Sequence, residues 1–149
     1  VGAADRSALA QRTSPAEIME VRRELEPIMA RLAALRARPI AIAAMAQLAS
    51  QAAQARSGKE YEKWDTALHA EIARSAGNSL FLQLFEVVSA LRAEQGWADL
   101  RQLTYSLDAR DQLSAQHSGI IQAIEQRNPE QAEARMRCHL NNVGSIFGI

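Results

Sequence analysis

The sequence contains three histidines, and each of them interrupts the apolar face of a predicted helix. His69 follows Asp65 by four residues, so on a helix the carboxylate and the imidazole lie one above the other. His117 and His139 lie in two later segments of helical periodicity. A buried carboxylate is costly unless it is paired or bound to a cation, and a buried imidazole needs hydrogen-bond partners. One divalent metal ion between the helices would account for all four residues together.

Each of these residues also has a plainer explanation. The Asp-x-x-x-His spacing is common by chance, and a lone histidine on an apolar face is more often a hydrogen-bonded core residue. The shared metal site gains weight because all three histidines fall on predicted inward faces. Imidazole and carboxylate ligands suit Zn, Ni, Fe, Mn or Co, so the sequence does not select the metal. Cys138 is adjacent to His139, but adjacent helical positions point about 100° apart, and we expect Cys138 to be structural.

Two further polar residues are candidates for binding a ligand beside the metal. Arg22 lies at the edge of an apolar stripe, where its guanidinium could hold a carboxylate. The alternative for Arg22 is a surface ion pair with Glu26, four residues later, which would contribute little. Asn142 lies one turn after His139 and could face the same cavity, or it could be a polar residue without a role.

Other charged residues are harder to assign from the sequence. Glu62, one turn before Asp65, is the nearest candidate for a general base, and we expect it to be an exposed charge instead. Arg92, Arg101 and Gln102 could line a ligand pocket or face solvent.

The segments that carry these residues have helical periodicity, and none alternates as a strand does. Ser14-Pro15-Ala16-Glu17 is typical of a capping box with proline at the first helical position. Gly77-Asn78 is expected to end one helix and begin the next. The helix after Asn78 is apolar over much of its circumference, which indicates a central position or a subunit interface. The stripe of the first predicted helix consists of Ile18, Val21, Leu25, Ile28, Leu32 and Leu35.

These elements predict an all-α fold, an antiparallel bundle of six helices around a central metal and ligand cavity. The count becomes seven if residues 96–107 form a helix of their own. The predicted boundaries are residues 15–38, 39–56, 59–76, a helix from 79, 108–127 and 129–147. Residues 1–13 are polar and small, which is typical of the end of a linker, so the domain is expected to span 14–149.

The composition limits the function further. The 149 residues fit one domain, and 48% hydrophobic with 23% charged residues is an ordinary globular balance. The 17 basic residues match the 17 acidic ones, so we expect no DNA binding by this chain on its own. We expect no transmembrane segment and no secretory leader, and the single cysteine fits a cytoplasmic protein without an internal disulfide. Because the chain begins Val1-Gly2 rather than with Met, we expect it to be either a trimmed chain or a fragment of a longer protein.

Several ordered motifs indicate a family. They are residues 21–27 (VRRELEP), residues 64–69 (WDTALH) followed by 76–78 (AGN), and the stretch from His117 to Leu140, which is the most specific. In order and spacing they resemble the C-terminal domain of FadR, the FCD family, which is the sensor half of many GntR-type transcription regulators. The resemblance covers residues 14–147. One departure is Leu68, where the family frequently has Phe, and this should alter packing more than metal ligation.

The resemblance implies that Asp65, His69, His117 and His139 bind one divalent metal ion inside the bundle, with Zn or Ni among the candidates. It implies a small organic acid or related metabolite beside the metal, held in part by Arg22. It also implies a homodimer, and DNA binding only through an N-terminal winged helix-turn-helix that this chain lacks.

Three hypotheses follow for the function. The first, which we favour, is a sensor whose bound effector shifts a dimer between two arrangements. The second is a small helical-bundle metalloenzyme that uses the same Asp and His residues. The third is a structural dimerisation module with core histidines.

Overall fold

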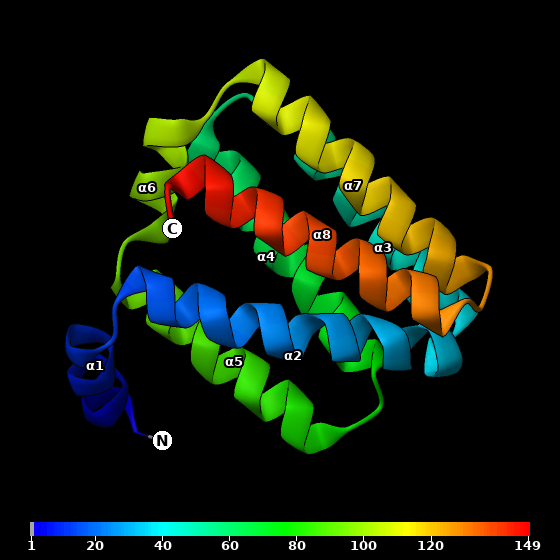
Figure 1. Cartoon of the computed structure of the whole chain (residues 1–149), viewed down its shortest axis with the longest axis horizontal. Helices are drawn as coiled ribbons and strands as arrows, with labels where there is room; N and C mark the ends of the chain where they lie inside the picture. Colours follow the sequence, from blue (N-terminus) through cyan, green and yellow to red (C-terminus); the bar gives the residue numbers. More distant parts are fainter. Residues whose placement is uncertain (1) are drawn as a thin grey trace.

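The computed structural model describes residues 2–149, which form eight α-helices and no strand (Figure 1). The predicted all-α fold is therefore confirmed. The helices are α1 (Ala3–Arg12), α2 (Pro15–Arg36), α3 (Pro39–Ala53), α4 (Gly58–Ser75), α5 (Ser79–Glu94), α6 (Trp97–Thr104), α7 (Leu107–Glu125) and α8 (Pro129–Phe147). None of the helices within the described residues is long and apolar enough to span a membrane.

Helices α2, α8 and α7 lie side by side, with α8 antiparallel to both of its neighbours (Figure 1). Helix α4 lies behind α8 and contacts α2, α3, α5 and α6. α5 runs antiparallel to α2 along its other side, and α1 packs against α5. α4 is thus surrounded by other helices, and its polar residues must find partners inside the protein.

The helices begin and end where local side chains cap them. Ser14 and Glu17 form the predicted capping box, in which the Ser14 hydroxyl accepts from the Glu17 amide and the Glu17 carboxylate accepts from the Ser14 amide. Gly77 has a left-handed φ of +69°, and the side chain of Asn78 caps α5, as expected. Side chains also cap the first turns of α4, α7 and α8, the helices that carry Asp65 and the histidines.

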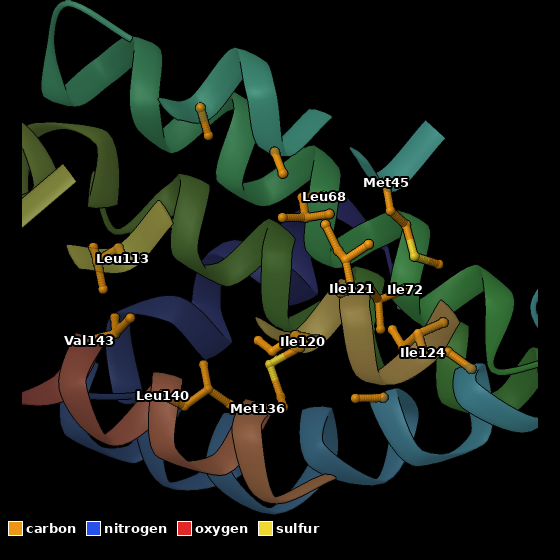
Figure 2. Packing of buried hydrophobic residues seen from close by; sticks show 14 of the residues in the cluster. Met45, Leu68, Ile72, Leu113, Ile120, Ile121, Ile124, Met136, Leu140 and Val143 are labelled. Carbon is orange, nitrogen blue, oxygen red and sulfur yellow. The ribbon is translucent and has the colours of Figure 1, made fainter. Parts of the chain in front are cut away.

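Buried apolar side chains from α3, α4, α7 and α8 interdigitate in the main core (Figure 2). Leu68 and Ile72 come from α4, and Ile120 of α7 and Leu140 of α8 belong to the same cluster. These residues flank His69, His117 and His139 along their own helices. The predicted inward faces of these three helices are therefore confirmed.

The apolar stripe of α2 faces the core only in part, since Ile18 is 2% exposed and belongs to the main core, whereas every second member of the stripe is exposed. Val21 is 48% exposed, Ile28 37% and Leu35 58%. The face of α2 that points inward is shifted by about one position, and it carries small residues such as Ala30 and Ala33 together with charged ones. Alanines let α8 approach α2 closely, and Val21, Ile28 and Leu35 are left on the outer side.

The described residues form eight helices, whereas the sequence predicted six, or seven if residues 96–107 formed a helix of their own. Residues 97–104 form α6, the seventh helix that was left open. Residues 3–12 form α1 within the segment expected to be a linker, and Ala10 is buried. α6 packs closely on α4. At Gly58 the two backbones are so near that an added Cβ atom would lie 2.5 Å from the Cα atom of Gln102. This close packing brings the polar residues of α6 next to those of α4.

Candidate metal centre

Asp65 and His69 of α4, His117 of α7 and His139 of α8 meet at one point inside the bundle. Each offers one ligand atom, and these atoms all lie within 4.8 Å of one another. Each of the four residues is only 1–2% exposed. Ligand atoms on opposite sides of a single ion at roughly 2.1 Å would lie about 4.2 Å apart, so small side-chain shifts bring these atoms to one ion.

The atoms that converge do not satisfy one another by hydrogen bonding. Oδ1 of Asp65 lies 3.0 Å from Nε2 of His117 and 3.3 Å from Nε2 of His69, but neither contact has hydrogen-bond geometry. Nε2 of His139 also lacks a hydrogen-bond partner within the described part of the chain. Buried polar atoms are rarely left unsatisfied. Four of them pointing at one place, with the donor set of a transition-metal site, fit a bound divalent cation.

The protonation of two histidines suits metal binding. Burial lowers the pKa of His139 well below its usual value, and the neighbouring His117 and His69 lower it further. Burial also lowers the pKa of His117, although Asp65 opposes this effect. Both imidazoles are therefore neutral at pH 7, and a neutral imidazole offers a free lone pair to a metal.

Neighbouring side chains orient two of the rings. Nδ1 of His69 lies 2.5 Å from Oε1 of Glu26 on α2, and Nδ1 of His139 lies 2.8 Å from Oε1 of Gln116 on α7. In each ring the opposite nitrogen, Nε2, is the one directed to the centre. Acceptors at Nδ1 are the usual means by which proteins fix the tautomer and orientation of metal-binding histidines.

Arg22 lies deeper than the sequence suggested. Its side chain is 1% exposed, and its Nε atom donates to Oε2 of Glu26 at 2.6 Å. The ion pair considered for these residues therefore exists, but it is buried rather than on the surface. Arg22 is joined to the centre through Glu26 and His69. Asn142 is half-buried, one turn after His139 on α8.

Glu62 is not an exposed charge, which corrects the sequence prediction. It is 7% exposed, and its two oxygens accept hydrogen bonds from Arg92 of α5 and Arg101 of α6. Arg101 also lies 3.6 Å from Oδ2 of Asp65. The partners of Glu62 come from other helices, so its own position in the sequence could not identify them.

Sequence reasoning missed the roles of Glu26 and Gln116. One signal was available for Glu26, because it lies four residues after Arg22, on the same face as Ile18. Gln116 directly precedes His117 in the sequence, but its contact is with His139 of α8. Only the packing of α7 against α8 reveals this role.

Comparison with known proteins places the chain in a family. A family model described as FCD domain matches residues 17–142. The solved structure of Streptococcus agalactiae GntR is similar, with a TM-score of 0.66 and 21% sequence identity. That similarity covers 96% of this chain but only 60% of the solved chain, so it concerns the fold of part of that protein. No match to this chain exists among the curated proteins.

Proposed function

The chain belongs to the FCD domain family, and from this premise we propose that it is the metal-dependent sensor domain of a GntR-type transcription regulator. Its ligand would be a small organic acid or a related metabolite. The observation that carries the proposal is the buried group of Asp65, His69, His117 and His139, whose free ligand atoms face one another.

The four residues would hold one divalent ion such as Zn or Ni and leave further positions for oxygen atoms of the effector. The ion would supply a Lewis-acidic anchor for a carboxylate. Because the residues come from α4, α7 and α8, they would also tie three helices together. A change in the ligation of the centre would therefore alter how these three helices pack in the bundle.

Arg22 and Asn142 are our proposed effector contacts from the chain itself. The Nε atom of Arg22 is committed to Glu26, so its terminal nitrogens are the ones that would meet a carboxylate. Asn142 would approach from α8, beside His139. The four ligands and Arg22 are almost fully buried, so an effector would have to enter through a transient opening between helices.

For the whole regulator we propose a cytoplasmic homodimer that binds DNA through a separate domain. An effector shifts such a dimer between two arrangements only by its difference in affinity for them. The neutral charge balance of this chain fits a sensing part rather than a DNA-binding one.

A metalloenzyme with the same centre is the alternative, and it would need a general base near the metal. Glu62 was the candidate in the sequence, yet both of its oxygens already accept hydrogen bonds from arginines. Both oxygens of Glu62 are therefore occupied by hydrogen bonds from arginines, which favours the sensor.

The test is elemental analysis of untagged protein purified without chelator, beside a His117→Ala/His139→Ala double variant. We expect about one divalent ion per chain in the parent and little in the variant. Small organic acids should then raise the melting temperature of the loaded parent but not that of the variant. Parent protein that stays free of metal after reconstitution would refute the proposal, and turnover lost on Glu62→Gln would favour the enzyme.

A further inference from the structure

A hollow of about 440 Å³ lies between α4, α5 and α6, away from the converging histidines. Its volume is within the range of small-molecule sites. Basic residues line it from two sides, Lys59 and Lys63 from α4 and Arg92 from α5, and the one acidic residue in its lining is Glu62. We call it the α4–α5–α6 pocket.

Two buried donors in the wall of this pocket have no hydrogen-bond partner within residues 2–149. They are Nε of Arg92 and Oγ of Ser89. The two residues lie three apart on α5, so they project from the same face of the helix. The guanidinium of Arg92 is 97% buried, since the residue is 3% exposed. An unsatisfied buried donor is costly, and two of them beside one hollow indicate a ligand that accepts hydrogen bonds.

The guanidinium of Arg92 is held in place before any ligand binds. Its Nη2 atom donates to Oε1 of Glu62, and its Cζ atom lies 5.0 Å from the ring centroid of Trp97. Trp97 is itself fixed, because it is 2% exposed and its Nε1 atom donates to Gln95. A donor that is already ordered loses little entropy when it binds an acceptor.

The charged residues that line the pocket have a basic excess, with three basic side chains and one carboxylate. Glu62 is shared between Arg92 and Arg101, and Arg101 has a second acidic neighbour in Asp65. Burial lowers the pKa of Arg92, and repulsion from Arg22 lowers it further. At the mouth, Lys59 pairs with Asp99, and both side chains are largely exposed. The local field therefore favours an anion.

We propose that the α4–α5–α6 pocket is a binding site for a small oxyanion, a carboxylate or a phosphate, held by Arg92 and Ser89 and attracted by Lys59 and Lys63. The anion accepts hydrogen bonds from Nε of Arg92 and from the Ser89 hydroxyl. The site is separate from the metal centre, and its occupancy does not require a metal.

Isothermal titration of the 149-residue chain with inorganic phosphate and with malonate tests this proposal, at constant ionic strength and with chloride as the reference anion. We expect saturable binding of at least one of the two, and the stronger one identifies the source of the oxyanion. Affinity should remain after the metal has been removed with a chelator. It should fall about tenfold in Ser89→Ala, which removes one hydrogen bond to a charged group.

Ser114→Ala is the matched control. The Ser114 hydroxyl is also buried and unpartnered in the described chain, but it lies on α7 beside a different hollow. Its removal should leave anion affinity unchanged. Arg92→Lys keeps the charge but not the Nε donor, and it should weaken binding while circular dichroism stays that of the parent. The proposal is overturned if neither anion binds, or if Ser89→Ala and Arg92→Lys both bind as the parent does. Binding that disappears with the metal but not in Ser89→Ala would place the anion on the metal and also overturn it.

Discussion

Oε1 of Glu26 lies 2.5 Å from Nδ1 of His69, and this contact joins α2 to a candidate metal centre whose four residues all come from other helices. The carboxylate is held in turn by Arg22, so the orientation of His69 depends on an ion pair one helix away. Burial of the pair is nearly complete. Such outer contacts set both the direction and the basicity of a metal-binding imidazole.

Glu26→Gln should therefore weaken metal binding without removing a ligand. We expect a loss of about 10–100-fold in affinity, the usual effect of changing a group that orients a ligand. Competition with a chromophoric chelator measures it. Glu20→Gln is the control, because Glu20 is exposed on the same helix. An unchanged affinity in Glu26→Gln would show that Glu26 does not position His69.

Metal binding should also depend on pH through His69. In the metal-free protein burial lowers the pKa of His69, but Asp65 and Glu26 outweigh burial and raise it to about 9. His69 must lose this proton to bind a metal, so protons compete with the ion at any pH below about 9. We expect affinity to rise by roughly tenfold per pH unit between about 7 and 9, with about one proton released per ion.

Titration calorimetry in two buffers of different ionisation enthalpy counts the released protons. The raised pKa of His69 fixes the direction of this pH dependence. The charged imidazole stabilises the metal-free state at low pH, and this stabilisation disappears as the pH rises through about 9. Affinity that falls between pH 7 and pH 9 would contradict the assignment of His69 as a ligand.

The positions of Asp65, His69, His117 and His139 could be predicted because each depends on the periodicity of its own helix. Spacing within a helix determines which residues share a face, and α4, α7 and α8 have clear inward faces. The capping residues of these helices act locally too.

What the sequence could not reveal depends on contacts between distant segments. Glu62 is buried because Arg92 and Arg101 come to it from α5 and α6, and nothing near Glu62 in the sequence indicates them. α1 is a polar segment that becomes a packed helix through contact with α5. Its own composition resembles that of a linker, and Gln95 completes the contact by donating to the carbonyl oxygens of Ala10 and Thr13.

The predicted apolar stripe of α2 was wrong at Val21, Ile28 and Leu35 for a different physical reason. Hydrophobicity alone favours Val21, Ile28 and Leu35 as inward residues, but close packing against α8 selects alanines instead. Large aliphatic residues seven apart on an outer face need another partner, and Leu80 and Leu84 of the neighbouring α5 are exposed as well. Exposed large aliphatic side chains of this kind are typical of an association site.

Leu35→Glu should therefore convert a homodimer of this chain into monomers. A second copy related by twofold symmetry would cover the outer face of α2, and a buried unpaired carboxylate there costs several kcal/mol. We expect the dimer dissociation constant to rise about a hundredfold or more, as measured by analytical ultracentrifugation. Leu103→Glu is the matched control, because Leu103 is 84% exposed on α6 and should leave the dimer intact. If Leu35→Glu sediments as the parent does, the outer face of α2 is not the dimer interface.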